Sequence, residues 1–465
     1  MMKATQRSIM DEQQALVDEF GQALKQRWSY YHAGAVNFNT EIQDLKNKIS
    51  RAPLTDDDLQ IEFQRILMLG IDGHARVSSA QYPDGSLPLL FGPVGSHLAV
   101  VKSDYSALLD ADHPFLESID GKPVSTWLEL ASRYIAKGSP QLVQGRGARM
   151  LSRNFRFLQK VGGFSQKDEV EVVLSSENGD KKSYPVKLQF GEHSRHIKKN
   201  PATERSLGPS RWLADGKIGY LRIARMDDAA AGEIDRWMQT FRGANGLVID
   251  VRNNGGGSRE ALRRMYSYLA SPHDEPHVIN AARYRKFKDF DYDHLTSRFM
   301  YRENDPHWSS REKSAIAKFR LGFSPKWIPP SEEFSDWHYL VLDREQHPGI
   351  YHFDKPVVVL SNEYIFSAAD IFMAGMRSLS NVTIIGTPSG GGSARVVNDT
   401  LSDGKTMVRM GSMISYQADG KLFDGVGVPV DIRVDPVPEF YLRYGLARDK
   451  ALDAACKLIL DRLKP

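Results

Sequence analysis

Apolar residues recur at two different spacings along this chain, and the change of spacing divides it into regions. Near the N-terminus they recur at every fourth residue, at Leu16, Phe20, Leu24 and Trp28. That period buries one face of an α-helix. Two more helices are expected, over 38–49 and from Thr55, which precedes three aspartates typical of a first helical turn. Residues 1–80 are therefore expected to form a helical N-terminal region that ends in a turn at His74.

Between residues 87 and 190 the period shortens to that of strands. Short apolar runs alternate with turn residues, and two helices are expected over 127–136 and 147–158. An Asn-Gly turn near the end of this stretch separates the two strands of an expected hairpin. The pattern predicts a small α+β unit over 87–190. Residues 191–210 show no periodicity and are expected to form a linker.

From residue 211 onward, β-branched runs alternate with helical periods. The runs at 246–251 and 356–360 are continuous and apolar, which is typical of strands buried on both faces. Each run is followed by a polar or glycine-rich turn and then by a helix. The pattern predicts an α/β core over 211–465, interrupted at 270–350 by an insertion rich in aromatic, charged and proline residues.

Composition excludes several classes of protein. A chain of 465 residues is expected to hold more than one domain. Its 61 basic and 58 acidic residues give a net charge of +3, and this near balance argues against a dedicated nucleic-acid-binding protein. The single cysteine, Cys456, excludes an intrachain disulfide framework and a cysteine-rich zinc site, and no metal or cofactor is expected.

Nothing in the sequence predicts a membrane protein. No apolar run is long enough to cross a bilayer. The first residues lack the apolar core of a signal peptide, so the protein is expected to be cytoplasmic, or exported if a leader has been removed. The oligomeric state is left open.

Ser367 lies where the turn after the run at 356–360 meets a helix. Two roles fit this position. As a helix cap, Ser367 has Asp370 three residues later, which resembles the spacing of a capping box. As a nucleophile, it would be followed by the free N–H of Ala368 at a helix N-terminus, where the helix dipole favours an oxyanion. Spacing alone leaves both roles open.

Three glycines at 255–257 directly follow the run at 246–251. They either form a tight strand-to-helix turn or let backbone N–H groups approach a ligand, which would make Gly256 a candidate oxyanion donor. His74 and Asp424 also lie in turns, although most histidines and aspartates in turns have no catalytic role. Each signal is weak alone. Acyl transfer needs a nucleophile, a base, a group that orients the base, and oxyanion donors.

Taken in order, four segments resemble motifs of the tail-specific, or C-terminal processing, family of serine peptidases. They are Asp-Gly-His at 72–74, Asp-Val-Arg-Asn-Asn-Gly-Gly-Gly at 250–257, Ser-Ala-Ala-Asp-Ile-Phe at 367–372, and Asp-Gly-Val-Gly-Val at 424–428. The resemblance covers residues 54–435. It implies a multidomain α/β protein in which 87–190 form a PDZ-like domain and a crotonase- or ClpP-like spiral of ββα units forms the peptidase core.

The chain departs from one branch of this family at the general base. The Ser–Lys branch has a lysine where this chain has Gly392, which has no side chain to accept a proton. The sequence is more similar to the Ser–His branch, related to the tricorn core protease and to retinoid-binding-protein modules. His74 matches the histidine of that branch and Asp424 its acidic partner, although aspartate replaces the usual glutamate. Gly73 replaces a serine that precedes the histidine in tricorn-like sites.

The resemblance therefore implies a serine peptidase that forms an acyl-enzyme with a peptide or protein substrate. Ser367 is the expected nucleophile, His74 the base, and Asp424 the acid that orients the base. A neutral histidine suits general base catalysis near pH 7. The backbone N–H groups of Gly256 and Ala368 are expected to bind the oxyanion.

Three further residues of the second motif, Asp250, Arg252 and Asn254, are expected to support the glycine turn by hydrogen bonds. Two alternatives to the peptidase remain. One is a catalytically inactive protein that binds peptides or lipophiles on the same fold, and the other is an ester hydrolase.

Overall fold

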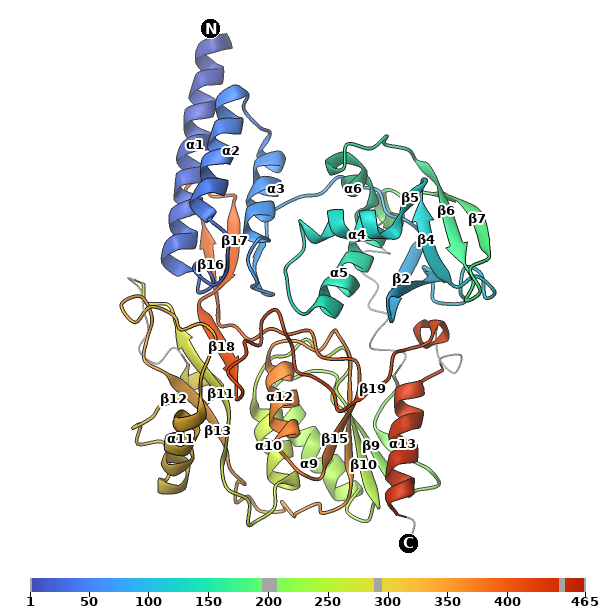
Figure 1. The fold of residues 1–465 in the computed structure, drawn as a ribbon, viewed down its shortest axis with the longest axis vertical. Coiled ribbons are helices and arrows are strands. Elements are labelled where there is room, and N and C mark those ends of the chain that lie inside the picture. Colours follow the sequence, from blue (N-terminus) through green and yellow to red (C-terminus); the bar gives the residue numbers. More distant parts are fainter. Residues whose placement is uncertain (1, 195–206, 288–294, 443–447, 464–465) are drawn as a thin grey trace.

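The computed structural model describes residues 2–194, 207–287, 295–442 and 448–463. It shows a mixed α/β protein made of several structural units (Figure 1). In this view the N-terminal helices stand at the upper left, an antiparallel sheet with its helices at the upper right, and two further sheets below. Most of the linker predicted at 191–210 lies outside the described residues.

The N-terminal region is helical, as predicted. Its helices are α1 (Met2–Arg27), α2 (Phe38–Arg51) and α3 (Asp56–Leu67). The predicted stripe on α1 is confirmed, because Phe20 and Leu24 are completely buried, as is Trp28 just beyond its end. The hydroxyl of Thr55 accepts the N–H of Asp58 and caps α3. These helices pack on a small antiparallel sheet of β1 (Arg76–Val77), β17 (Met407–Gly411) and β16 (Val396–Thr400), in that order.

The next unit is an antiparallel sheet with three helices. The sheet order is β2 (Leu89–Val94), β3 (His97–Lys102), β4 (Phe115–Ile119), β6 (Glu169–Ser175) and β7 (Lys181–Lys187), with β5 (Lys122–Pro123) paired to β4. The helices are α4 (Val124–Ser132), α5 (Pro140–Arg153) and α6 (Phe155–Val161). The single helix predicted over 147–158 is wrong, because Asn154 has φ −134° and ψ 38° and separates α5 from α6.

A six-stranded sheet forms the centre of the molecule. Its order is β19 (Ile432–Arg433), β15 (Val382–Gly386), β14 (Val357–Ser361), β10 (Gly246–Asp250), β9 (Ile218–Arg222) and β8 (Arg211–Leu213). All pairs are parallel except β8 with β9. Parallel pairing explains the continuous apolar runs, since helices cover both faces of the sheet.

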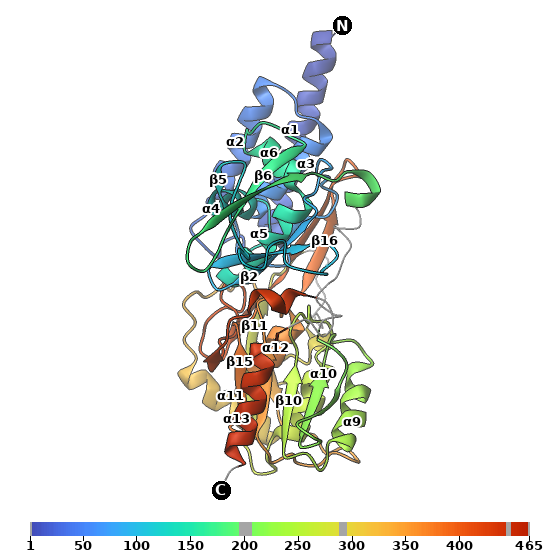
Figure 2. The same cartoon turned by 90° about the vertical axis from the view of Figure 1, so that its right-hand side faces the viewer.

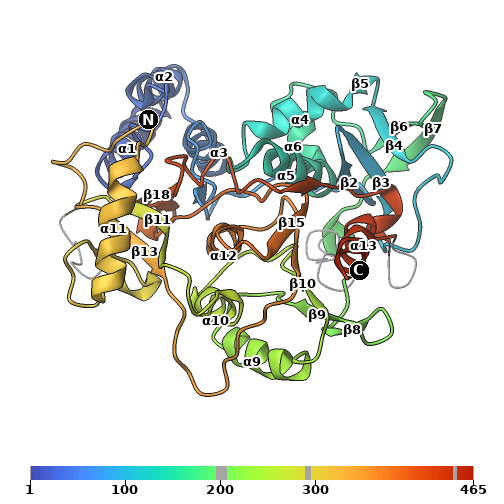
Figure 3. The same ribbon diagram turned by 60° about the horizontal axis from the view of Figure 1, so that its bottom comes forward.

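Those helices form two layers, one on each face of the central sheet (Figures 2 and 3). One layer holds α9 (Ala230–Thr240), α10 (Glu260–Leu269) and α12 (Ala368–Arg377), and the other holds α13 (Lys450–Arg462). Successive residues of a strand pack against opposite layers: Val359 packs against the first layer and Val358 against the second.

The insertion at 270–350 contains regular structure that the sequence did not reveal. It holds β11 (His277–Tyr284), the 3-10 turn η1 (Thr296–Arg298), β12 (Tyr301–Arg302), α11 (Ser310–Gly322) and β13 (His338–Leu342). The strands form an antiparallel sheet with β18 (Met413–Gln417), in the order β12, β13, β11, β18. Because β11 and β13 are buried along almost their whole length, they lack the alternation of polar and apolar residues that identifies a strand. A further 3-10 turn, η2 (Pro438–Tyr441), precedes α13.

The parallel register of the central sheet positions the candidate site. Asp250 at the end of β10 pairs with Leu360 near the end of β14. The turns that follow these neighbouring strands therefore emerge at the same edge of the sheet, where ligands of open α/β sheets commonly bind.

Candidate active site

Ser367 lies in the turn between β14 and α12 and is half-buried. Its backbone has φ 60° and ψ −125°, a conformation that residues with a Cβ seldom adopt. The hydroxyl makes no capping hydrogen bond to the helix. Of the two roles that the sequence left open, the cap is therefore absent from the structure. Backbone strain of this kind is concentrated at functional sites.

The glycine turn after β10 packs directly on this strained turn. A Cβ added to Gly256 would lie 2.6 Å from the Cβ of Ser367 and 2.7 Å from the amide nitrogen of Ala368, and Gly256 has φ 94°. Only glycine allows two backbones to approach so closely here. The N–H of Phe366 donates to the carbonyl oxygen of Asn254 at 3.0 Å and ties the two turns together.

The two expected oxyanion donors differ in their partners. The N–H of Ala368 donates to no residue in the described part of the chain, as is usual in a first helical turn. The N–H of Gly256 donates to the side-chain oxygen of Asn254 at 2.9 Å. Asn254 in turn donates to the carbonyl oxygen of Ile223 at 2.9 Å. Asn254 therefore fixes the glycine turn and occupies the Gly256 donor in this structure.

Asp250 and Arg252 lie farther from Ser367, within a buried ion-pair network. Arg252 donates to Asp250 at 2.6 Å and to Asp449, the N-cap of α13, at 2.8 Å. Burial would raise the pKa of Asp250, but the charges of Arg252 and Arg222 lower it to about 2. The pair thus anchors the start of α13 to the end of β10, and the glycine turn itself is held by Asn254.

His74 follows α3 in a turn, and its ring lies against Phe366 with 4.5 Å between the ring centroids. Since Phe366 precedes Ser367, the structure brings His74 beside the strained turn. No hydrogen bond joins His74 to Ser367 among the described residues, and His74 Nδ1 is buried without a partner. Burial, together with the charge of Arg146, lowers the pKa of His74 to about 3. The imidazole is therefore neutral at neutral pH.

Two buried carboxylates lie beside His74, although the sequence gave a role to only one of them. A ring nitrogen of His74 and oxygens of Asp72 and Asp424 lie within 4.8 Å of one another. Nδ1 is 4.0 Å from Asp72 Oδ1, which is beyond hydrogen-bonding distance. Burial, followed by repulsion from Asp72, raises the pKa of Asp424 to about 7. Asp72 was visible in the Asp-Gly-His motif, but nothing in the sequence indicated that its side chain faces the histidine.

A histidine with two carboxylates also has the composition of a metal-ligand set. Here, however, each carboxylate already accepts three hydrogen bonds. The donors are Trp28, His74 and Gly411 for Asp72, and Tyr30, Gly73 and Ser393 for Asp424. These donors satisfy most of the oxygen lone pairs. We therefore interpret Asp72 and Asp424 as an acid pair that orients and stabilises the histidine rather than as metal ligands.

Comparison with known families places these turns in context. Residues 217–434, which include the glycine turn, Ser367 and Asp424, match the model of peptidase family S41. This part of the chain belongs to peptidase family S41. His74 precedes the matched residues.

The curated relatives of this chain are proteases that are longer than the matched segments. Tricorn protease of Thermoplasma volcanium is 22% identical over 253 residues, which are 54% of this chain and 18% of the relative. A carboxy-terminal-processing protease of Bartonella bacilliformis is 33% identical over 93 residues, which are 20% of this chain and 21% of the relative. The chain thus spans about a fifth of the length of the curated relatives it matches.

Solved structures with a similar fold cover almost the whole chain. Mature CPAF has a TM-score of 0.67 at 17% identity, with 98% of this chain and 99% of that chain covered. A putative peptidase from Parabacteroides merdae has a TM-score of 0.51 at 15% identity, with 97% and 98% covered. At these identities the likeness shows the fold alone.

The Phe366 ring lies at both positions where this chain departs from the motifs of the two branches. A Cβ added to Gly392, where the Ser–Lys branch has lysine, would lie 2.2 Å from the Phe366 ring. A Cβ added to Gly73, where tricorn-like sites have serine, would lie 2.6 Å from the same ring. The aromatic ring therefore fills the space that either side chain would enter, and it does so against His74.

Asp370 organises the loop that carries Gly392. It is completely buried in α12, and its carboxylate accepts the Ser389 hydroxyl and the N–H groups of Gly391 and Gly392, each amide at 3.1 Å. Burial raises the pKa of Asp370 to about 8. The sequence suggested that Asp370 completes a capping box with Ser367, but the side chain binds this loop instead.

Helix α5 of the preceding unit lies on the loops around Ser367. Gln141 and the hydroxyl of Ser139 both donate to the carbonyl oxygen of Ser389 at 3.0 Å. The guanidinium of Arg146 stacks over the Phe366 ring at 4.9 Å. This contact places a cation of α5 on the ring that packs against His74, which no sequence pattern indicated.

The structure thus gathers the predicted site residues into two groups that meet at Phe366. Ser367, Ala368, Gly256 and Asn254 form one group, and His74 and Asp424 form the other.

No helix in the described part of the chain combines the length and hydropathy needed to span a membrane.

Proposed function

We propose that this chain is a serine peptidase that hydrolyses peptide bonds through an acyl-enzyme. Ser367 is the nucleophile, His74 the general base, and Asp424 the acid that orients the imidazole. The observation that carries the proposal is the strained backbone of Ser367, φ 60°, packed against Gly256 at the start of a buried helix. A helix cap requires no such strain, whereas a nucleophile on a sharp strand-to-helix turn does.

The proposed reaction uses the neutral imidazole. Its pKa of about 3 leaves His74 free to accept the proton of the Ser367 hydroxyl as that oxygen attacks the scissile carbonyl. The same proton then passes to the leaving amine, and water hydrolyses the ester bond in a second cycle. Ionised Asp424 stabilises the imidazolium that forms in between. For the proton transfer, the His74 ring must move into hydrogen-bonding distance of Ser367, because no such bond exists in the described structure.

Oxyanion stabilisation is assigned to the N–H groups of Ala368 and Gly256. Each such donor is typically worth about 3 kcal/mol of the barrier. The Ala368 amide has no described partner and lies at the positive end of the α12 dipole. The Gly256 amide must leave Asn254 to take part, and its closeness to Ser367 supports this role.

The substrate is proposed to bind as an extended peptide. Strand β16 is the outer strand of its sheet and begins three residues after Ser393, whose N–H donates to Asp424 at 2.9 Å. A peptide added along this free edge would run toward the acid pair. This edge and the protease names of the curated relatives support a peptide over another acyl substrate.

The domain organisation is proposed on the same basis. The N-terminal region is 1–80, a PDZ-like domain covers 87–190, and a linker covers 191–210. A crotonase- or ClpP-like peptidase core covers 211–465 and carries the insertion at 270–350. The five-strand order with flanking helices supports the PDZ-like unit, and the parallel strands followed by helices support the core.

Labelling by a fluorophosphonate tests the proposal. We expect covalent labelling of the native chain at neutral pH, loss of labelling in Ser367→Ala, and hydrolysis of a denatured protein such as casein by the native chain only. Labelling without proteolysis, together with cleavage of a p-nitrophenyl ester, would indicate the ester hydrolase. An unlabelled native chain that still retains peptides would indicate the inactive binding protein.

A further inference from the structure

Three arginines from separate segments meet beside the candidate site. Arg259 follows the glycine turn, Arg395 follows the loop that donates to Asp424, and Arg298 ends η1 in the insertion. Arg259 donates to the carbonyl oxygen of Arg298 at 3.1 Å, and Arg395 donates to the hydroxyl of Ser297 at 3.0 Å. Arg259 and Arg395 thus both contact the η1 turn that carries Arg298.

No carboxylate in the described part of the chain pairs with these three arginines. Arg259 is completely buried, and its donors reach only neutral groups, the carbonyl of Arg298 and the side chain of Asn280 at 3.2 Å. The Nε atoms of both Arg259 and Arg298 are buried without a hydrogen-bond partner. A buried cation without a counter-charge is unfavourable, so such an arrangement needs a reason.

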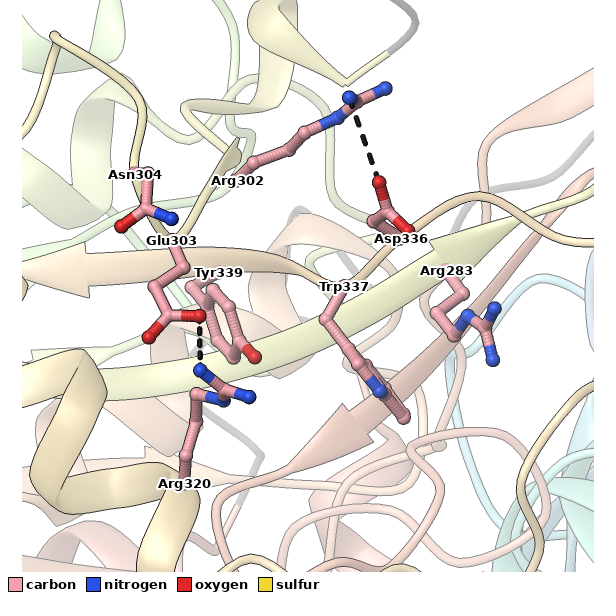
Figure 4. A pocket seen from close by; sticks show the side chains of 8 residues that line it. All are labelled: Arg283, Arg302, Glu303, Asn304, Arg320, Asp336, Trp337 and Tyr339. Carbon is pink, nitrogen blue, oxygen red and sulfur yellow. Dashed lines mark hydrogen bonds and ion pairs between the residues drawn. The ribbon is translucent and has the colours of Figure 1, made fainter. Parts of the chain in front are cut away.

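The same insertion shows how the chain pairs arginines elsewhere. A pocket of about 530 Å³ on the insertion is lined by Arg302 and Arg320 among other residues (Figure 4). Arg302 faces Asp336 at 3.6 Å, and Arg320 pairs with Glu303 (Figure 4). Two other arginines of the insertion therefore have acidic partners, while Arg298 has none among the described residues.

The backbone that holds Arg298 is strained. Phe299 follows it with φ 54° and ψ 38°, a left-handed conformation that is a genuine outlier for a bulky residue. The Phe299 ring lies under the guanidinium of Arg263 at 4.1 Å, which holds the turn in place. Burial and the charge of Arg395 lower the pKa of Arg298 to about 10, and Arg298 in turn lowers the pKa of His74. The Arg298 cation is therefore close enough to change the pKa of His74, the proposed base.

Two further arginines near His74 are paired across strands. Arg76 of β1 is the direct cross-strand partner of Arg409 of β17. Like charges in this position destabilise an antiparallel pair. Both arginines also lower the pKa of His74. Beside the acid pair, the candidate site therefore also has several cations near His74, and these would attract an anionic substrate group.

We infer that Arg298 and Arg395 form a subsite for a carboxylate of the substrate, beside the scissile bond, with Arg259 as its buried support. The inference rests on the proposed peptidase function. A guanidinium binds a carboxylate through paired, charge-assisted hydrogen bonds, and the bound anion would supply a counter-charge that the described residues do not. Because Arg395 immediately precedes the outer strand β16, a peptide along that strand would pass these side chains. The carboxylate belongs either to an Asp or Glu side chain or to the C-terminus of the peptide.

Cleavage of a peptide mixture, followed by mass spectrometry, tests the subsite in the full chain. The mixture is a tryptic digest of a bacterial lysate, offered with free or amidated C-termini. We expect the native chain to prefer Asp or Glu at one fixed position, or free C-termini at a fixed distance, by about tenfold to a hundredfold. Arg298→Met is expected to lose the preference while Ser367 is still labelled by fluorophosphonate, and Arg298→Lys is expected to retain part of it.

The matched control is Arg302→Met, which removes a cation from the same insertion and is expected to keep the native preference. A native chain without any carboxylate preference, or a preference that survives in Arg298→Met, would overturn the inference. Ser367→Ala separates it from the proposed function: this variant is expected to retain acid-bearing peptides from the same mixture, and the double variant with Arg298→Met is not. Retention that does not depend on Arg298 would also overturn it.

Discussion

Ser367 and its glycine turn are held by neighbouring strand ends of one parallel sheet, whereas His74 and its carboxylates are held by segments from several parts of the chain. On the serine side, the turns after β10 and β14 meet directly, and Asn254 joins them through Phe366 and Gly256. On the histidine side, Trp28 just after α1 donates to Asp72 at 2.9 Å, and Tyr30 donates to Asp424 at 2.7 Å.

This difference assigns different tasks to the two sides. The serine side is rigid because parallel strand pairing and a buried helix determine it. The histidine side depends on the docking of the N-terminal helices, and the docking of α5 places Arg146 behind Phe366. Since His74 and Ser367 are not hydrogen bonded in the described structure, we expect adjustment of the site to occur on the histidine side. The following variants test each side separately.

The largest effect is expected from Asp424→Asn. Removal of an acid that orients and stabilises a catalytic histidine lowers kcat by up to about 10⁴-fold, and we expect a loss of this order in casein hydrolysis. Asp72→Asn is the matched comparison, because both carboxylates are buried and accept three hydrogen bonds. Asp72 accepts the backbone N–H of His74 and so holds the turn rather than the ring. Its variant is therefore expected to lower the melting temperature clearly and kcat only slightly. A larger loss of kcat in Asp72→Asn would transfer the role of the acid to Asp72.

On the serine side, Gly256→Ala is expected to reduce kcat/KM by about 10²- to 10³-fold. The added methyl group would lie 2.6 Å from the Ser367 Cβ, and φ 94° disfavours alanine, so the strained turn must move. Gly255→Ala is the control, because a Cβ there would meet nothing within 4 Å. Equal activity of the two variants, measured by peptide hydrolysis and by fluorophosphonate labelling, would contradict the proposed contact between the turns.

At the boundary between the two sides, Gly392→Lys is expected to destabilise the protein by about 1 to 3 kcal/mol without producing a Ser–Lys site. Its Cβ would lie 2.2 Å from the Phe366 ring, and the destabilisation should shrink in a Phe366→Ala background. Thermal unfolding of the two single variants and the double variant measures this coupling. Gly243→Lys is the control, since a Cβ at Gly243 has open space. A cost at Gly392 that is the same with and without Phe366 would contradict the steric explanation.

The two sides also differ in how far the sequence predicted them. Local patterns were sufficient for the elements of the serine side, because β10, β14 and α12 each follow from a contiguous run of residues and parallel pairing brings their turns together. The role of Ser367 itself came only from the resemblance of the motifs. The histidine side depends on contacts between distant residues. The pairing of Asp72 with Trp28 leaves no periodic signal, and neither does the approach of Arg146 to Phe366. The insertion sheet was missed for a related reason: β11 and β13 are buried on both faces, so their polar and apolar residues do not alternate.

The smallest effect is expected from Tyr30→Phe, which removes one donor to Asp424 without changing charge. Burial holds the pKa of Asp424 at about 7, and the Tyr30 hydroxyl stabilises the ionised form. Its loss should therefore raise that pKa by about 0.5 to 1 unit. Activity requires ionised Asp424, so kcat/KM is expected to rise through pH 7 in the native chain and at higher pH in the variant.

The neighbouring residue provides the control for this shift. Tyr31 donates to Asn39 at 3.1 Å, away from the acid pair, so Tyr31→Phe is expected to keep the native pH profile. His74 itself is neutral above about pH 3 and contributes no transition in this range. A native profile that rises near pH 6 and is unchanged in Tyr30→Phe would instead assign the titration to a histidine of ordinary pKa. That result would mean that the N-terminal helices do not tune the acid, and it would remove the main reason for treating the histidine side as an assembly of distant segments.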